Sequence, residues 1–443
     1  MNLTLELNRP TRLINFRLSL HASFKFRADA LFELIDALLL SPGMRAVIEL
    51  SLSPTWRRRF ASVYDALRHG QLDREQLRKT FAEAEPPDAL TVEGYAIYAV
   101  DSTPHPRPDA KTLPDRGAVY VAERNGTVAG HQFSWLGRII ARGSSWFAAR
   151  EVDRIPTHST PAAVGGEQVS ALAATNCAQP KVVVGDSHYA HKSFLKPFSG
   201  LSLVHALVRL ACNRVLYKPP APKSGKPGRP AVHGPKFSLK HPGVPERQAQ
   251  FNFRGQSVRL SAWGQLHFKW LPALVGLALR VEFLKADGTP RYARPLWLFW
   301  SGPADIALSH LATMYLLRFG IEHFFRFLKQ HLGLLAMHST DLIAVENWVW
   351  VVALAYWQLL LARDGVSAQY HPWDPTARRD PTRPLTPGQV RQAWAVFSRG
   401  LGTPATVPSP AGKGPGRVAG FHPKPRPAYP VITQKAKQAA AAV

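Results

Sequence analysis

The chain has 443 residues, 46% of them hydrophobic, with 12 Trp and 22 Phe, so it can bury a large core and form more than one domain. Its 55 Lys and Arg outnumber its 30 Asp and Glu. The resulting formal charge of +25 favours a polyanionic partner, either nucleic acid or an anionic membrane surface. The two cysteines form no CxxC pair, which argues against a disulfide framework or a structural zinc site and favours a reducing, cytoplasmic location.

A membrane partner has little support in the sequence. The most apolar run, Trp348–Ala362, is short for a membrane span and contains Gln358. No basic-then-apolar leader with a small-residue cleavage site opens the chain. We therefore expect nucleic acid as the partner and no membrane.

Residues 1–92 show helical apolar spacing, for example in "ALFELIDALLL", and predict a helical N-terminal domain. Its basic edge suggests DNA binding, although no specific helix-turn-helix signature is present. "GYAIYAVDS" (94–102) then reads as a strand and leads into a proline-rich loop. Two further strands around an Asn-Gly turn predict a hairpin. "GGEQVSALAAT" predicts a helix, and "KVVVGDS" (181–187) has the continuous apolar run of a central buried strand.

The amino-acid composition changes after residue 216. From residue 214 to residue 259, ten Lys or Arg stand against the single acid Glu246, among many Pro and Gly. This stretch is either a solvated linker or a loop that contacts nucleic acid. Strand-like segments follow it, so we expect a basic, β-rich insertion over 217–300. Residues 93–216 and 301–365 would form the two parts of one α/β core, and 366–443 a disordered basic tail.

Two predicted strands end in an aspartate, Asp101 and Asp186. Each alone is commonly a turn or helix-capping residue. Together at the carboxyl ends of parallel strands, with Glu322 from a helix packed on the sheet, they could bind divalent metal through hard oxygen ligands. His188 and His191 lack a third ligand and are better interpreted as surface or DNA-facing residues, and Asp109 and Asp115 lack strand support.

The segment Met314–Gln330 predicts one helix with two stripes. Tyr315, Arg318, Glu322 and Lys329 follow one another at three, four and seven residues, which places them on one face. The simplest interpretation, a surface ion pair between Arg318 and Glu322, leaves Tyr315 and Lys329 unexplained. The neighbouring stripe is wholly apolar and should face the core: Met314, Leu317, Ile321, Phe324 and Leu328.

The spacing Tyr-x2-Arg-x3-Glu-x6-Lys resembles the signature of DDE transposases from bacterial insertion sequences. Successive blocks over roughly residues 95–360 also look like one such subgroup, among them "DSTPHPRPDAKTLPDR", "GHQFSW", "VVVGDSHYAHKSFL" and "RFGIEHFFRFLKQHLG". The resemblance implies a ribonuclease H-like mixed sheet flanked by helices and interrupted by a β-rich insertion. The proline-rich loop after Asp101 departs from what the family would lead one to expect there.

By this resemblance, Asp101, Asp186 and Glu322 would be both the catalytic residues and the ligands of two Mg²⁺ ions, for which Mn²⁺ could substitute. Tyr315, Arg318 and Lys329 would grip DNA phosphates, and an aromatic side chain of the insertion would stack on a flipped base. Trp263 and Trp270 are the candidates for stacking, with a core position as the alternative for either. The basic stretch would add further DNA contacts through Arg214 and Lys218.

The expected function is metal-dependent cleavage of double-stranded DNA at the terminal inverted repeats of a mobile element, followed by joining of the 3′ ends to target DNA. A homodimer on DNA is expected because two ends are cut together, and the location would be the bacterial cytoplasm, associated with the nucleoid. Two alternatives remain open. One is a DNA-binding protein derived from a transposase that no longer cuts, and the other is a ribonuclease H-like, structure-specific nuclease.

Overall fold

The computed structural model describes residues 3–142, 145–175, 178–222, 231–367, 373, 384–410, 416, 418–422 and 424–433. Its α-helices are α1 (Leu3–Ala22), α2 (Ala28–Leu40), α3 (Ser62–His69), α4 (Arg74–Glu83), α5 (Pro161–Ala174), α6 (Lys192–Leu195), α7 (Leu308–Leu316), α8 (Gly320–His331), α9 (Leu342–Ala362) and α10 (Pro387–Phe397). Its strands are β1 (Phe24–Phe26), β2 (Gln71–Leu72), β3 (Thr91–Val92), β4 (Tyr95–Pro106), β5 (Gly117–Val121), β6 (Gly126–Ile139), β7 (Phe147–Arg154), β8 (Lys181–Gly185), β9 (Val204–Leu210), β10 (Val215–Tyr217), β11 (Lys236–Ser238), β12 (Arg247–Phe253), β13 (Gln256–Phe268), β14 (Leu271–Phe283) and β15 (Leu296–Trp300).

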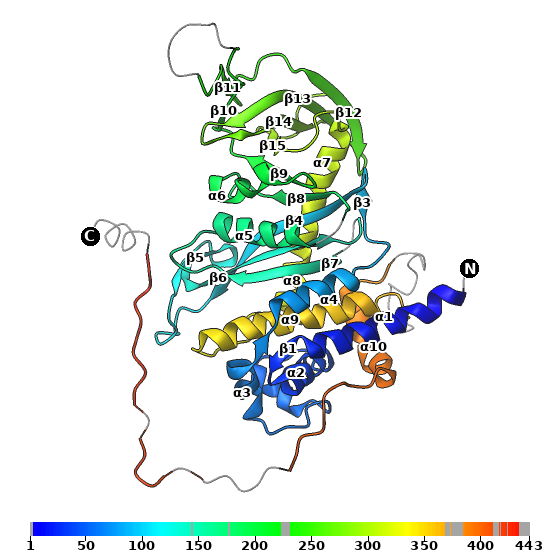
Figure 1. Cartoon of the computed structure of the whole chain (residues 1–443), viewed down its shortest axis with the longest axis vertical. Coiled ribbons are helices and arrows are strands. Elements are labelled where there is room, and N and C mark those ends of the chain that lie inside the picture. The colour runs from blue at the N-terminus through cyan, green and yellow to red at the C-terminus, as the bar shows by residue number, and fades with distance from the viewer. Residues whose placement is uncertain are drawn as a thin grey trace.

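Thirteen of the described strands form one mixed sheet, which occupies the upper part of the view in Figure 1, above the N-terminal helices. Its main path is β11-β10-β13-β14-β15-β9-β8-β4-β6-β5, with β12 on β13, β3 on β4 and β7 on β6. Only the β4–β8 and β8–β9 pairs are parallel among the pairings described. The predicted hairpin is confirmed: β5 and β6 pair antiparallel, with Val121 opposite Gly126.

Side chains alternate between two cores along the central strands, as the two-residue period of a strand requires. In β8, Val182 and Val184 belong to a core shared with α7, α8 and α9, whereas Val183 belongs to a core shared with α5 and α6. The whole strand is buried, which confirms the prediction of a central strand in this segment. Helices therefore cover both faces of the sheet at its centre.

Helix α9 lies between the sheet and the N-terminal helices (Figure 1) and contacts α1, α2, α3, α10 and β7. Phe81 of α4 stacks on Trp357 of α9, with ring centroids 4.9 Å apart, and Phe16 of α1 lies on the same indole at 5.7 Å. Helix α9 has the length and composition of a membrane span, but 83% of its most apolar window is buried. Packing between the helices and the sheet accounts for its hydrophobicity.

One buried cluster contains residues from each of the five segments predicted as separate domains, for example Leu13, Ile97, Leu260, Trp357 and Trp394. The segments share a core because helices from both ends of the chain cover the same face of the sheet. The strands of the expected insertion, β11–β15, likewise continue the central sheet: β15 pairs antiparallel with β9, with Trp300 opposite Leu207.

The expectation of a disordered tail is wrong for the part that forms α10. A capping box between Thr386 and Gln389 begins this helix, and Val390 and Trp394 are buried. Further along, the Ile432 N–H donates a hydrogen bond to the Arg116 carbonyl oxygen at 2.8 Å. Residues 223–230, the centre of the basic loop, lie outside the described residues.

Candidate active site

Asp101 and Asp186 lie at the same level on adjacent parallel strands. Asp186 directly follows the end of β8, as predicted, but β4 continues from Asp101 to Pro106, so the prediction that its strand ends at Asp101 and gives way to a loop is wrong. Ala99 of β4 lies opposite Val184 of β8, and each aspartate follows two residues later. By the strand alternation, both side chains point to the face that α8 covers. The Asp101 and Asp186 side chains are 20% and 27% exposed, so both are accessible from solvent.

Local hydrogen bonds hold the two carboxylates in place. Asp101 Oδ1 accepts a hydrogen bond from the Ser102 N–H at 2.8 Å. Asp186 Oδ1 accepts from the His188 N–H at 2.8 Å, and its Oδ2 lies 3.0 Å from His188 Nδ1. The aspartate-centred turn at Asp186 is one that Asp favours generally. Here it holds the carboxylate directly after the end of β8.

The helix predicted over Met314–Gln330 is interrupted. Helix α7 ends at Leu316, a 3₁₀ turn (Leu317–Phe319) follows, and α8 begins at Gly320. The prediction of one continuous α-helix is therefore wrong, and a glycine at the junction, a poor helix former, is consistent with the break. Arg318 lies in the 3₁₀ turn and Glu322 in the first turn of α8.

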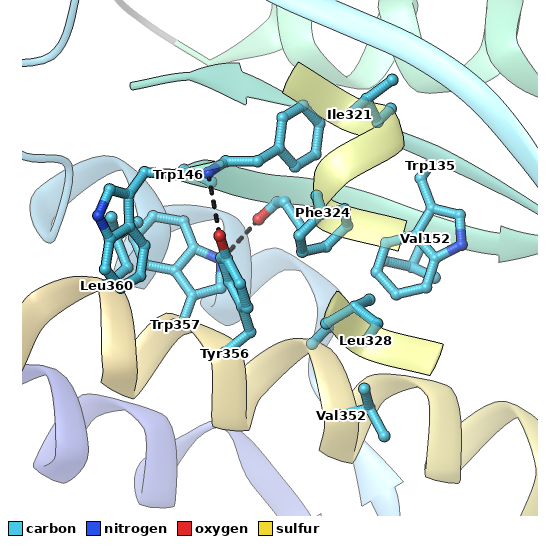
Figure 2. Packing of buried hydrophobic residues seen from close by; sticks show 14 of the residues in the cluster. Trp135, Trp146, Val152, Ile321, Phe324, Leu328, Val352, Tyr356, Trp357 and Leu360 are labelled. Carbon is cyan, nitrogen blue, oxygen red and sulfur yellow. Dashed lines mark hydrogen bonds between the residues drawn. The ribbon is translucent and has the colours of Figure 1, made fainter. Parts of the chain in front are cut away.

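The apolar stripe is confirmed as the core face. All five of its members are buried, and Phe324 and Leu328 lie among side chains of β6, β7 and α9 (Figure 2). The ring centroids of Phe324 and Tyr356 are 4.8 Å apart in an edge-on arrangement. This packing fixes α8 on the sheet and thereby fixes the position of Glu322.

Arg318 joins the strand carboxylate to the helix carboxylate. Its Nη1 donates to Asp101 Oδ2 at 2.9 Å, and its Nη2 donates to Glu322 Oε1 at 3.1 Å. The Arg318 side chain is 17% exposed and that of Glu322 is 42% exposed. The sequence predicted a phosphate contact for Arg318. Its internal bridge to Asp101 was not foreseen, because that contact spans 217 residues of sequence.

The three carboxylates interact electrostatically. Burial raises the pKa of Asp101 to about 6 against the opposing effects of Arg318 and the Ser102 N–H, and the charges of Asp186 and Glu322 raise it further. Burial disfavours the charged form of Arg318, but the surrounding groups, Asp101 first among them, raise its pKa above the usual value. The site is thus a concentration of negative charge that is partly neutralised by one guanidinium.

The donor set fits a divalent cation by its chemistry, because all three groups are carboxylates, whose hard oxygens such cations prefer. As arranged, however, no three His, Cys, Asp or Glu side chains among the described residues gather around a single point close enough to hold an ion. The Arg318 guanidinium occupies the position between Asp101 and Glu322.

The other two residues of the helix signature differ in exposure. Tyr315 is buried, with 7% of its surface exposed, and burial raises its pKa; Arg318 and Arg209 lie near enough to oppose that shift. Lys329 lies in the last turn of α8, where it is partly exposed. The structure thus brings Tyr315 next to Arg318, whereas Lys329 is two helical turns beyond Glu322.

Tyr189 lies near this site, in the core that α5 and α6 cover, and was not predicted from the sequence. It is 1% exposed, and burial together with the nearby charges of Asp101 and Asp186 raises the pKa of its phenol well above the usual value. Two glycines make room for its ring. A Cβ built on Gly165 or Gly185 would lie 2.8 or 2.9 Å from Tyr189 atoms. Glycine inside the helix-forming run at Gly165 was the available signal for such a close approach.

A partly buried chain of polar side chains also links the sheet to the N-terminal helices. Ser134 Oγ donates to Gln168 Oε1 at 2.9 Å, Gln168 Nε2 donates to Asp153 Oδ2 at 2.7 Å, and Arg74 of α4 donates to Asp153 Oδ1 at 2.9 Å. These residues come from β6, α5, β7 and α4. Because buried polar groups depend on their partners, this chain fixes the relative positions of the four elements.

The two tryptophan candidates have different environments. Trp263 is 3% exposed, packs on Phe237 and Trp297, and donates from its indole to the Val244 carbonyl oxygen at 3.0 Å. These contacts leave no free ring face for a base and favour the core alternative. Trp270 lies in the β13–β14 turn, only partly buried.

Trp270 and Arg214 both border the loop that follows Asp186. The Trp270 ring centroid is 6.5 Å from that of His191, and Arg214 Nη2 donates to the Ala190 carbonyl oxygen at 3.3 Å. Lys218 points elsewhere: its Nζ donates to Glu246 and, at 3.0 Å, to the Gly264 carbonyl oxygen. Of these residues, Trp270 and Arg214 are therefore the ones positioned beside the candidate site.

Comparison with known families settles the family. The family model of the DDE superfamily endonucleases matches residues 19–267, more than half of the chain and including Asp101 and Asp186. The chain belongs to the DDE superfamily endonucleases. A cryo-EM structure of a piggyBac transposase synaptic complex with hairpin DNA is similar at 11% sequence identity and a TM-score of 0.39, covering 86% of this DDE endonuclease and 74% of that chain. No curated protein matches the sequence.

Proposed function

We propose that this DDE endonuclease is the transposase of a bacterial insertion sequence. It would cut phosphodiesters at the ends of its element and join the freed 3′ ends to target DNA. One observation carries the proposal: Asp101 and Asp186 lie at the same level on the adjacent parallel strands β4 and β8, and Arg318 links Asp101 to Glu322 on the covering helix.

We infer a ribonuclease H-like core from the central strands. The order β7-β6-β4-β8-β9, with three antiparallel strands followed by two that run parallel to β4, supports this inference. Within this core, Asp101, Asp186 and Glu322 would hold the metal. Bound Mg²⁺, or Mn²⁺ in its place, would activate the attacking oxygen and stabilise the leaving oxygen of the phosphodiester.

The chain's own residues would position the DNA. A guanidinium offers two parallel hydrogen bonds to a phosphate and an ammonium offers a point charge, so Arg318 and Lys329 fit phosphate contacts on either side of Glu322. Tyr315, which is buried beside Arg318, would orient the guanidinium and reach only a phosphate that enters the site. Trp270 and Arg214, beside the loop after Asp186, would contact the strand near the cut.

The partners would be double-stranded DNA and a second copy of the protein. The formal charge of +25 supplies affinity for DNA that is independent of base sequence. Binding releases counterions from the DNA, and this gain shrinks as the salt concentration rises, so the affinity should weaken steeply with added salt. A homodimer that pairs two element ends, in the bacterial cytoplasm and associated with the nucleoid, completes the proposal.

The test is a cleavage and strand-transfer assay on DNA carrying the inverted repeats that flank the gene, with Mg²⁺ and with chelator. Asp186→Asn removes one ligand charge without touching Arg318, and Glu322→Gln removes another. Asp109→Asn, in the exposed loop after β4, is the matched control. Metal-dependent joining that is lost in the first two variants and kept in the control, with DNA binding intact in all, is the expected result.

Two other outcomes would replace the proposal. Cutting without joining would identify a structure-specific nuclease. Salt-sensitive binding with no cutting by the unaltered protein would identify a DNA-binding derivative of a transposase.

A further inference from the structure

All three candidate metal ligands already have partners within the chain. Asp101 and Glu322 each accept a hydrogen bond from Arg318, at 2.9 and 3.1 Å. Asp186 accepts from the His188 backbone and lies 3.0 Å from its ring nitrogen. Of the two partner side chains, only the guanidinium is charged at every pH near neutrality.

Arg318 engages one oxygen of each of two candidate ligand carboxylates. Its two terminal nitrogens go to Asp101 Oδ2 and Glu322 Oε1, one to each, so the guanidinium lies between a strand and a helix that are far apart in the sequence. The strand carboxylate is anchored by the Ser102 N–H and the helix by its apolar face. A cation that took both of these oxygens would therefore have to displace the guanidinium from between them.

We propose that Arg318 is an internal counter-ion of the metal site: it holds Asp101 and Glu322 in the metal-free protein, and a divalent cation binding there displaces it towards DNA phosphate. The proposal rests on the proposed function in taking Asp101, Asp186 and Glu322 as the ligands. Its new content is that the signature arginine competes with the metal and is released by it.

The competition has a thermodynamic consequence. A cation that takes the carboxylate oxygens must break both contacts of Arg318, which weakens its binding to the protein alone. The freed guanidinium then becomes available to a phosphate, for which its two parallel donors are suited. By linkage, a phosphate that engages Arg318 strengthens metal binding by the same factor as the metal strengthens phosphate binding. Metal loading and DNA binding would thus favour each other through one side chain.

The test measures Mn²⁺ binding to the full chain without DNA, by titration with detection of free Mn²⁺ by electron paramagnetic resonance at fixed pH and ionic strength. Arg318→Gln should bind Mn²⁺ about tenfold more tightly than the unaltered protein or better, which equals about 1.4 kcal/mol of removed competition. Arg318→Lys keeps a charge but cannot span both carboxylates with a fork, so its affinity should fall between the two.

Arg209→Gln is the matched control for charge alone. Arg209 is exposed on β9, and its charge, like that of Arg318, lowers the pKa of Tyr315. Within the described part of the chain, Arg209 makes no ion pair with Asp101 or Glu322. Its substitution should change Mn²⁺ affinity by less than about twofold, or about 0.4 kcal/mol. The double variant Arg318→Gln/Glu322→Gln should lose the tight binding, which locates the ion.

Each remaining result overturns the inference. Equal or weaker binding in Arg318→Gln would mean that the arginine organises the ligands instead of competing for them. An equal gain in Arg209→Gln would reduce the effect to net charge. If either occurs while Mg²⁺-dependent cleavage persists in the unaltered protein, the inference fails and the proposed function stands. If neither the unaltered protein nor Arg318→Gln binds Mn²⁺, both fail.

Discussion

Trp357 of α9 donates a hydrogen bond from its indole nitrogen to the carbonyl oxygen of Ala149 in β7, at 2.7 Å, with both residues buried (Figure 2). The same indole stacks on Phe81 of α4. A single side chain thus connects the sheet, the central helix and the N-terminal helices.

Trp357→Phe removes the donor and leaves the Ala149 carbonyl oxygen buried without this partner. We expect the free energy of unfolding to fall by about 2–3 kcal/mol, measured by urea denaturation. Trp373→Phe, at a tryptophan that is 79% exposed, should change it by less than about 0.5 kcal/mol. Equal changes in the two variants would show that the hydrogen bond from Trp357 to Ala149 does not contribute measurably to the free energy of unfolding.

Two buried histidines predict a loss of stability in acid. Burial lowers the pKa of His105 to about 3 and that of His131 to about 4, so both rings are neutral in the folded protein. The unfolded chain takes up these protons near pH 6.5. Stability should therefore be complete above pH 6.5 and fall as the pH drops towards 4, by up to about 1.4 kcal/mol per pH unit for each histidine.

The measurement is the unfolding free energy of the unaltered protein and of His131→Gln from pH 7.5 to pH 5. His131→Gln should flatten the dependence by the share of one histidine, whatever it does to stability at pH 7.5. His188→Gln, at a side chain that is 81% exposed, is the control. An unchanged slope in His131→Gln would contradict the prediction.

Gly185 is required by the ring of Tyr189. A Cβ at Gly185 would lie 2.9 Å from Tyr189 Cβ and 3.1 Å from Cγ, directly before the proposed ligand Asp186. Gly185→Ala should lower the free energy of unfolding by about 1–3 kcal/mol and reduce cleavage, because the tyrosine and the aspartate turn must shift together. Gly200→Ala, where an added Cβ would meet nothing within 4 Å, should be neutral or slightly stabilising in the same denaturation and cleavage assays.

Trp270 is the aromatic residue that we expect to stack on a base near the cut. Trp270→Ala should weaken binding of DNA ends by about 1–3 kcal/mol, and the fluorescence of 2-aminopurine placed beside the cleavage position should report the loss of stacking. Tyr292→Ala, at another exposed aromatic of the β-rich stretch, should leave both signals unchanged. A Trp263→Phe variant that alters them more than Trp270→Ala does would refute the assignment.

The central strands and the apolar face of α8 could be predicted from the sequence because their signals are local. A continuous apolar run ends at Asp186, and the stripe from Met314 to Leu328 repeats at steps of three and four. Local signals also identified Asp101 and Glu322. Their closeness to each other follows from strand order and helix packing, which the spacing of one sequence does not contain.

What escaped prediction depends on contacts between distant segments. Arg318 pairs with a residue 217 positions away, and its helix is broken by a 3₁₀ turn that periodicity alone does not reveal. Trp263 is an aromatic residue in a basic, strand-rich stretch, which suggested base stacking, but its side chain is buried in the core. Helix α10 was not predicted because the segment around it is basic and rich in Pro and Gly, although Thr386 and Gln389 form a capping box.

The late position of α9 in the chain has a consequence for folding during synthesis. The sheet strands are made first, but one apolar face of the sheet stays uncovered until α7, α8 and α9 have been synthesised, near residue 362. Until α8 has been made the nascent chain lacks Glu322, and until α9 has followed it lacks the full cover of its core, so it is exposed to aggregation. A copy truncated by a premature stop before α9 would be a folding failure and not a partially active nuclease.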